Sequence, residues 1–185
     1  MNQEIDVSKV VLKTKRLTLR SWDIKDLDDF YEYAKEDIGQ MTTWLPHQNK
    51  EETSKILKKF IEDKKTFALE YENKVIGSLG IERYNEQELP EFNALKGREL
   101  GFVLSKKYWG RGLMPEAVLA VIQYLFEDVK LDFIICEHFL DNIQSCRVQE
   151  KCGFVHFKLG KCQTHYGATK DTWISVLYNI NKNSY

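Results

Sequence analysis

The residues best suited to binding chemistry lie in the stretch LSKKYWGRGLMPEA. There Gly110 and Gly112 flank Arg111, Lys106 and Lys107 precede them, and a long apolar helical pattern follows. The first N–H groups of a helix lack intrahelical partners and carry partial positive charge, so such an end attracts anions. Glycines let the backbone approach a phosphate closely, and the basic side chains add charge. The pattern indicates a phosphate site. A tight turn with solvated basic residues explains the same residues equally well.

Two common phosphate motifs do not fit this stretch. The string G-x-x-x-x-G-K-[ST] of a P-loop is absent from the chain. The dinucleotide fingerprint G-x-G-x-x-G would need a third glycine where Pro115 stands, and the stretch follows an antiparallel hairpin pattern. Pro115 instead suits the first turn of a helix, where a missing N–H costs nothing.

The elements before this joint are predicted from periodicity and turn residues. Residues 10–20 are rich in β-formers and predict one strand, and residues 66–84 predict a hairpin turning near Glu72–Asn73. Apolar residues at helical spacing predict helices over 22–36, with Asp23 as the N-cap, and over 50–65. The polar stretch 85–97 is expected to be an exposed connection.

The elements around and after the joint predict a parallel strand pair. An apolar strand over 98–104, a helix over 112–129 and a strand over 131–136 form a βαβ crossover, which joins parallel strands. A short helix over 142–153 follows, and a hairpin around Tyr166–Gly167 closes the chain. The fold class is therefore α/β, with a mixed sheet that is antiparallel early and late and parallel in the middle.

Composition narrows the function classes. The 185 residues favour one domain, and the net charge of −1 provides no global field for nucleic acid or an anionic membrane. We expect no nucleic-acid partner and no membrane partner. The absence of a long apolar run or a signal-peptide pattern predicts a cytoplasmic protein.

The cysteines and histidines show no metal-binding spacing such as C-x-x-C or H-x-x-H. They are Cys136, Cys146, Cys152 and Cys162, and His47, His138, His156 and His165. We therefore expect reduced, packed thiols and no metal site or metal cofactor.

Three motifs, in order, resemble one family. KYWGRG resembles the Q/R-x-x-G-x-G/A acyl-CoA-binding motif of the GNAT superfamily of N-acetyltransferases, with Lys107 at the Gln/Arg position. The wider ELGFVLSKKYWGRGLMPEAV, together with TKRLTLR and DNIQSCRVQEKCGF, is similar to the RimJ/RimL branch, the ribosomal-protein N-terminal acetyltransferases. The resemblance runs from about Thr14 to Tyr178 and so covers nearly the whole chain.

This resemblance implies a GNAT-like single N-acetyltransferase domain over residues 10–181. Its two central parallel strands would splay apart, with acetyl-CoA as co-substrate in the opening, and the pantetheine would pair with the backbone of Phe102, Val103 and Leu104. The pyrophosphate would sit on the N–H groups of a loop. The loop residues are Lys107, Tyr108, Trp109, Gly110, Arg111 and Gly112.

The resemblance also points to catalytic residues. Ser145 is the predicted proton donor to the leaving thiolate, and Asn142 is a predicted ligand of pantetheine or water; a hydroxyl with only local hydrogen bonds is the alternative for Ser145. A backbone N–H near Val103 would polarise the thioester carbonyl. Glu99 would accept the amine proton, unless it pairs with Arg98 or solvent. Because an α-amino group has a pKa near 8, such an acceptor would tolerate a weak base.

We therefore predict an acetyl-CoA-dependent N-acetyltransferase that transfers the acetyl group directly in a ternary complex. No cysteine is paired with an evident base, so no acyl-enzyme is expected. The acceptor would be a protein N-terminal amine or a small amine such as an amino acid, polyamine or aminoglycoside, and the protein a monomer or homodimer. Trp44 and Tyr84 are candidates for the acceptor wall or for simple packing. A non-catalytic acyl-CoA-binding module and a nucleotide-binding protein remain alternatives.

Overall fold

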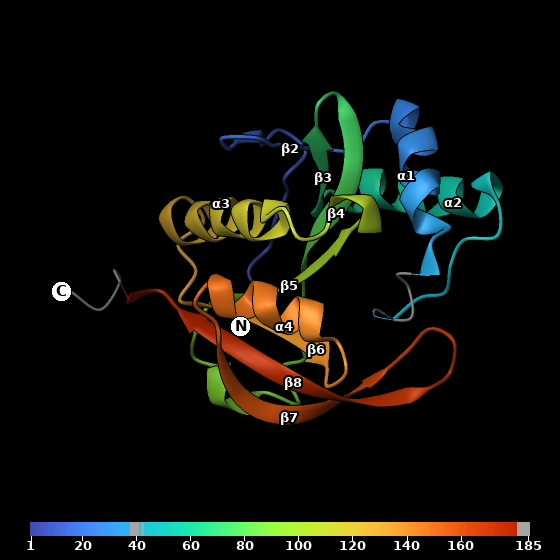
Figure 1. Cartoon of the computed structure of the whole chain (residues 1–185). Coiled ribbons are helices and arrows are strands. Elements are labelled where there is room, and N and C mark those ends of the chain that lie inside the picture. Colours follow the sequence, from blue (N-terminus) through green and yellow to red (C-terminus); the bar gives the residue numbers. More distant parts are fainter. Residues whose placement is uncertain (38–40, 42, 181–185) are drawn as a thin grey trace.

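A computed structural model describes residues 1–37, 41 and 43–180 (Figure 1). One eight-stranded sheet has the order β1-β2-β3-β4-β5-β6-β8-β7. The strands are β1 (Leu12–Lys13), β2 (Thr18–Arg20), β3 (Thr66–Tyr71), β4 (Lys74–Glu82), β5 (Gly97–Leu104), β6 (Phe133–Phe139), β7 (Val155–Gln163) and β8 (Thr169–Tyr178). The α-helices are α1 (Leu27–Ala34), α2 (Lys50–Asp63), α3 (Leu113–Glu127) and α4 (Ile143–Lys151). The predicted mixed α/β sheet is confirmed.

The hairpin of β3 and β4 turns where the sequence predicted. Glu72 and Asn73 both adopt left-handed backbone conformations, with φ of 50° and 62°, which is typical of a two-residue turn that matches strand twist. The prediction of a single strand over residues 10–20 is wrong. Thr14 N–H donates to the Leu17 carbonyl at 2.9 Å, so the chain reverses there and forms the short antiparallel pair β1 and β2.

Helix starts follow their capping residues. The Asp23 side chain accepts a hydrogen bond from the Lys25 N–H and forms a reciprocal pair with Asp26, which confirms the predicted N-cap, although the first turn is a 3₁₀ turn before α1. Asn49 caps α2 by accepting from the Glu52 N–H at 2.9 Å. These side chains satisfy backbone donors that would otherwise lack partners.

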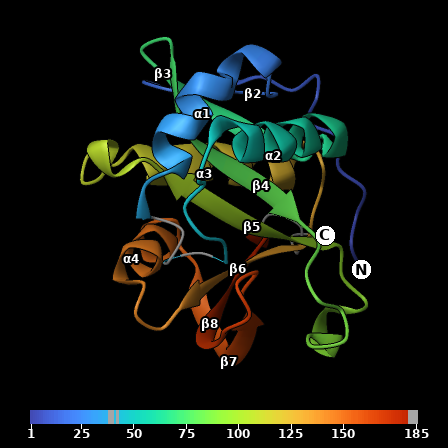
Figure 2. The same ribbon diagram turned by 90° about the vertical axis from the view of Figure 1, so that its right-hand side faces the viewer.

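Helices cover both faces of the sheet, as Figures 1 and 2 show. On one face, α1 and α2 pack over β3 and β4, where Ala68 and Val75 belong to the buried cluster of Phe30. On the other face, α3 packs against a larger core that includes Leu69 and Leu79. Alternate residues of one strand therefore serve two separate cores, because successive side chains point to opposite faces.

The parallel pair in the middle of the sheet separates partway along its length. β5 and β6 pair from Gly97 with Phe133 as far as Leu100 with Cys136. Beyond that point β5 continues along β4 to Leu104, and β6 continues along β8 to Phe139. The predicted splay is thus present, and it leaves one backbone edge of β5 without a strand partner.

The connection between β4 and β5 differs from the prediction of an exposed, irregular segment. Leu89 and Phe92 are only 1% exposed, and the Phe92 ring stacks on Phe133 with centroids 4.3 Å apart. Tyr84 is buried in the same cluster and is therefore a packing residue. The stretch was predicted to be exposed because most of the residues next to Leu89 and Phe92 in the sequence are polar.

The first residues of the chain also contact the sheet. Val7 is buried, and Asn2 forms a parallel bridge with Gly97. None of the described helices is both long enough and apolar enough to cross a membrane.

Candidate active site

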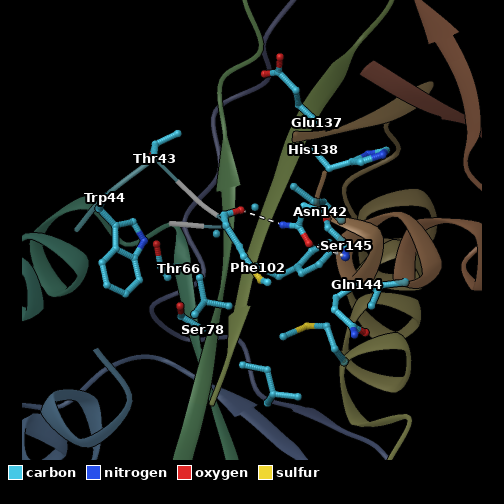
Figure 3. A pocket seen from close by; sticks show the side chains of 18 of the residues that line it. Thr43, Trp44, Thr66, Ser78, Phe102, Glu137, His138, Asn142, Gln144 and Ser145 are labelled. Carbon is cyan, nitrogen blue, oxygen red and sulfur yellow. Dashed lines mark hydrogen bonds between the residues drawn. The ribbon is translucent and has the colours of Figure 1, made fainter. Parts of the chain in front are cut away.

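The splay between β5 and β6 opens a cavity of about 770 Å³. Phe30, Trp44 and Phe60 line it from the α1 and α2 face, whereas Met114 and Val148 line it from the α3 and α4 face. Figure 3 shows Trp44, Thr66 and Ser78 on one side of the cavity and Asn142, Gln144 and Ser145 on the other, with Phe102 between them. The cavity therefore passes through the sheet and joins its two faces.

The free edge of β5 is lined by the predicted pantetheine-binding residues. Ser105 N–H donates to the Ile76 carbonyl at 2.9 Å, and inter-strand bonds alternate in an antiparallel pair, so the register turns the Val103 backbone toward Ser78 on β4. The N–H and C=O groups of Phe102 consequently face the opening. An N–H near Val103 was predicted as the donor to the thioester carbonyl, and in this register the N–H that faces the opening is that of Phe102. The Leu104 carbonyl is occupied, since it accepts from Trp109 Nε1 at 2.8 Å.

The loop between β5 and α3 presents unpaired donors at the start of a helix. Gly110 and Gly112 have φ of 76° and 73°, a region that glycine enters without steric cost. Gly112 occupies the N-cap of α3 and provides no side-chain cap. Within the described part of the chain, no hydrogen bond engages the N–H groups of Gly110, Arg111 and Gly112. This arrangement suits a phosphate, and Pro115 lies in the first turn of α3 as predicted.

The lysines of the loop are neutralised by carboxylates instead of facing the cavity. Lys107 Nζ lies 2.5 Å from Glu32 Oε1, and Lys106 pairs with Asp37. Hydrogen bonds from Lys107 and then Lys74 lower the pKa of Glu32 to about 2. The positive charge at the loop therefore comes from the helix end and from other side chains.

Arg16 is a loop residue to which the sequence analysis assigned no role. Its Nη1 donates to the Arg111 carbonyl at 2.9 Å, and its Nη2 lies 2.7 Å from Glu116 Oε2 on α3. A Cβ built on Gly112 would lie 3.7 Å from Arg16 Nη2. Arg16 thus connects the β1–β2 turn to the phosphate loop. The motif TKRLTLR carried this residue, but local sequence could not indicate a contact across about a hundred residues.

Asn142 begins α4 and joins it to the loop after α1. Its Oδ1 accepts from the Ser145 N–H at 3.0 Å, and its Nδ2 donates to the Met41 carbonyl at 2.8 Å. The side chain lines the cavity, but both of its polar ends have protein partners. Its geometry is that of a residue that positions α4, and the predicted contact with pantetheine or water stays a prediction.

Ser145 lies in the first turn of α4 and lines the cavity. Its Oγ accepts a hydrogen bond from Gln149 Nε2 at 3.3 Å, and Gln149 Oε1 lies 3.2 Å from His138 Nδ1. Because Gln149 donates to this oxygen, the hydroxyl proton of Ser145 remains available to another acceptor. No local motif indicated that Gln149 would contact His138 and Ser145 together.

Glu99 lines the cavity without a charged partner. No described residue forms a hydrogen bond or ion pair with its carboxylate. The alternative pairing with Arg98 is absent, because the Arg98 guanidinium donates to the Gln3 carbonyl. Burial, and to a lesser extent the neighbouring Glu137, raises the pKa of Glu99 to about 8. Such a carboxyl can exchange a proton near neutral pH.

The α1 and α2 side of the cavity combines aromatic walls, acidic groups and an open position. Trp44 lines the cavity, and its predicted role in an acceptor wall stays a prediction. Glu82, which pairs directly opposite Glu99 across β4 and β5, and Glu137 also line it. A Cβ added to Gly101 would meet no atom within 4 Å, so this glycine leaves space at the centre of the wall.

The four cysteines are free thiols, as expected. The fold brings together three side chains that the spacing rules did not connect, since potential ligand atoms of His138, Cys146 and His156 all lie within 4.8 Å of one another. The histidine and cysteine spacing gave no signal because these residues come from β6, α4 and β7.

Known proteins with similar sequences and structures are acetyltransferases. The chain is 27% identical to the N-acetyltransferase YnaD of Bacillus subtilis over 147 residues, which are 77% of this chain and 81% of YnaD. It superposes on a GNAT-family acetyltransferase from Bacillus anthracis with a TM-score of 0.80 at 25% identity, covering 92% of this chain and 99% of that one. It also resembles the microcin C7 self-immunity acetyltransferase MccE, solved in complex with acetyl-CoA and AMP, with a TM-score of 0.73 at 17% identity and coverage of 89% and 93%.

The family model of the acetyltransferase (GNAT) domain matches residues 16–155, which include β2, the splayed strands, the glycine loop and α4. The match therefore spans most of the chain, including in full two of the motifs that carried the resemblance and the third, TKRLTLR, from Arg16 onward. The chain belongs to the GNAT family of acetyltransferases, in its RimJ/RimL-like branch.

Proposed function

We propose that this N-acetyltransferase binds acetyl-CoA on the α3 and α4 face and an α-amino group on the α1 and α2 face, and transfers the acetyl group directly between them. The cavity that passes through the sheet carries this proposal, because residues of both faces line it, so that a cofactor bound on one face and an amine bound on the other can meet inside it. MccE, a protein of similar fold, was solved in complex with acetyl-CoA, which supports acetyl-CoA as the co-substrate.

The cofactor would be held mainly by backbone groups. The unpaired N–H groups of Gly110, Arg111 and Gly112 would receive the pyrophosphate at the positive end of α3. The free N–H and C=O groups of Phe102 would pair with the pantetheine arm, as an added strand would. The thioester would then lie at the point where β5 and β6 separate.

The chemistry needs a neutral amine, a polarised carbonyl and a proton for the thiolate. The Glu99 carboxylate takes a proton from the ammonium group, and the free amine nitrogen attacks the thioester carbon. The Phe102 N–H stabilises the negative charge that develops on the carbonyl oxygen. After the attack, the new C–N bond leaves a second proton on the nitrogen, and this proton passes to solvent. As the C–S bond breaks, the Ser145 hydroxyl gives its proton to the sulfur and recovers one from solvent, while Glu99 releases its proton to solvent. The products are the amide and CoA thiol.

The pKa of Glu99 favours an α-amino group over a lysine side chain. An α-amino group has a pKa near 8 and a lysine about 10.4, whereas Glu99 has a pKa of about 8. Proton transfer between groups of matched pKa has an equilibrium constant near one. Transfer from a lysine, whose pKa is about two higher than that of Glu99, would have an equilibrium constant of about 10⁻². The acceptor is therefore the N-terminal amine of a peptide or protein, or the α-amine of a small molecule.

The test is thiol release from acetyl-CoA in the presence of defined amines. The panel contains short peptides with free N-termini, the same peptides with acetylated N-termini and a free lysine side chain, single amino acids, spermidine and an aminoglycoside. We expect faster thiol release with free α-amines only. Preference for spermidine or the aminoglycoside would overturn the α-amine assignment. Tight CoA binding with no acceleration by any amine would favour a non-catalytic acyl-CoA-binding module instead.

A further inference from the structure

We propose that His138, Cys146 and His156 form a binding site for a divalent transition-metal cation such as Zn²⁺, next to the acetyl-transfer cavity. Their potential ligand atoms lie within 4.8 Å of one another, and the residues come from β6, α4 and β7. Imidazole nitrogen and thiolate sulfur are the ligands that zinc takes in proteins, whereas magnesium and calcium prefer oxygen.

The spacing of the ligand atoms is close to that of a coordinated ion. A tetrahedral site with Zn–N of about 2.0 Å and Zn–S of about 2.3 Å has ligand atoms roughly 3.3 to 3.6 Å apart. Cys146 Sγ lies 3.9 Å from His156 Nε2. Small rotations of the side chains would bring the three groups to coordination distance without movement of the strands.

The two histidines are already oriented by their neighbours. The His156 ring stacks on Trp173, with centroids 4.7 Å apart and planes 7° apart. His138 Nδ1 lies 3.2 Å from Gln149 Oε1, which leaves His138 Nε2 as the nitrogen for the metal. In metal-binding histidines the N–H of the second ring nitrogen usually donates a hydrogen bond to a neighbouring oxygen in this way, and the contact sets the ring orientation.

The site is open on one side. His138 is buried, Cys146 is half-buried and His156 is exposed, so an ion can enter from solvent. Glu150 Oε1 lies 3.7 Å from Cys146 Sγ, near enough to complete the coordination or to hold a metal-bound water. Three protein ligands with a fourth carboxylate or water is a common zinc arrangement. On binding, the Cys146 thiol releases its proton and coordinates as the thiolate.

A hydrogen-bonded chain connects this site to Ser145, and this second step rests on the proposed function. A metal on His138 Nε2 holds the ring proton on Nδ1, which then donates to Gln149 Oε1. Gln149 in turn keeps its amide directed at Ser145 Oγ, so the hydroxyl proton points toward the thioester sulfur. Gln149 is thus a positioning residue, and metal occupancy would favour the productive orientation of Ser145.

Metal binding is tested directly on the metal-free protein, independently of any acetyl transfer. Co²⁺ is titrated first, because thiolate coordination produces a charge-transfer absorption, and Zn²⁺ affinity is then measured by competition with a chromophoric chelator. Cys162→Ser is the matched control, since Cys162 is also a half-buried free thiol. We expect one equivalent bound by the wild-type protein and by Cys162→Ser, and at least tenfold weaker binding with no charge-transfer band in Cys146→Ser.

His156→Ala provides a second variant at an exposed position, and it should weaken Zn²⁺ at least tenfold with unchanged circular dichroism. The site is overturned if the wild-type protein fails to compete with the chelator, or if Cys146→Ser and His156→Ala bind as tightly as wild type. For the link to Ser145, kcat should rise with bound Zn²⁺ in wild type and not in Cys146→Ser. If kcat is the same with and without bound Zn²⁺, the proposed link to Ser145 is wrong, but the metal site stands. If the wild-type protein shows no acetyl transfer at all, only the proposed function is contradicted.

Discussion

Glu99 and Ser145 differ from most polar side chains around the cavity because each retains hydrogen-bonding capacity that its neighbours do not use. Lys107 and Lys106 are paired with carboxylates, and both ends of the Asn142 amide are occupied. Among the described residues, Glu99 has no partner, and the Ser145 hydroxyl accepts a hydrogen bond but donates none. Groups that retain an unused lone pair or proton beside a cavity are the ones that can act on a substrate.

Replacing Glu99 by Gln removes the proposed base without changing the side-chain shape. We expect kcat/KM for the amine to fall by about 10²-fold or more, because general-base catalysis contributes that much. In the wild-type protein kcat/KM should rise with pH up to about 8 and then level, following the pKa of about 8 of Glu99. The measurement is a pH–rate profile of thiol release for both proteins. A Glu99→Gln profile identical to wild type would exclude Glu99 as the base.

Replacing Ser145 by Ala removes the proposed proton donor to the thiolate. We expect kcat to fall about 10- to 100-fold, since a general acid acts in the transition state and not in cofactor binding. The dissociation constant for acetyl-CoA, measured by calorimetry, should change less than twofold. Ser145→Thr keeps a hydroxyl and should recover most of the rate. An unchanged kcat in Ser145→Ala would leave Ser145 as a residue of local structure only.

At the level of elements, the β5–α3 junction is shaped by two glycines in left-handed conformations. A side chain at Gly112 would strain the backbone by about 1 to 2 kcal/mol, while its Cβ would lie at an ordinary van der Waals distance of 3.7 Å from Arg16 Nη2. We expect Gly112→Ala to weaken acetyl-CoA binding about tenfold, as the loop N–H groups lose their alignment. Gly167→Ala is the matched control, because Gly167 has a φ of 85° in the β7–β8 turn, away from this loop. Equal CoA affinity in both variants would contradict the pyrophosphate assignment.

The second prediction for an element concerns the wall that β5 presents to the acceptor. Gly101 leaves open space in the cavity, so a leucine there would occupy the volume meant for the amine. We expect Gly101→Leu to raise the KM for the amine at least tenfold while acetyl-CoA affinity stays the same. Initial-rate kinetics with each substrate varied in turn separate the two effects. A larger effect on CoA than on the amine would place the acceptor elsewhere.

At the scale of the whole molecule, Glu99 connects the site to folding stability. A carboxyl of ordinary pKa in the unfolded chain, about 4.3, is shifted to about 8 in the folded protein. Between these values the folded state holds the proton more tightly, so the stability associated with Glu99 is fully present below about pH 4.3 and decreases as the pH rises toward 8.

Glu99→Gln should therefore become more stable relative to wild type as the pH rises. We expect the difference in the free energy of unfolding to grow by about 1 kcal/mol or more between pH 5 and pH 9. Urea unfolding of both proteins at pH 5, 7 and 9 measures this difference, and the other titrating groups cancel in the comparison. A difference that does not change with pH would mean that Glu99 has an ordinary pKa.

Sequence reasoning succeeded for features that depend on neighbours along the chain. Hairpin turns, the βαβ crossover, the Asp23 cap and the glycine loop are local patterns, and each lies where it was expected. It failed where distant contacts decided the outcome. The hydrogen bond between Thr14 and Leu17 divides an expected strand into two. Phe92 lies in a polar stretch of the sequence but is buried against Phe133. Burial in the tertiary fold outweighs local polarity because a single aromatic ring contributes more free energy than several solvated side chains.

By itself, the sequence determined the family, the order of elements and the loop that suits a phosphate, since these follow from motifs and periodicities. Only the tertiary structure decided that Glu99 has no hydrogen-bond or ion-pair partner among the described residues, that the backbone of Phe102 and not of Val103 faces the opening, and that Arg16 supports the glycine loop. It also decided that His138, Cys146 and His156 meet. The physical reason is the same in each case: the charge state, the free backbone groups and the ligand distances of a site depend on which distant segments the folded sheet brings into contact.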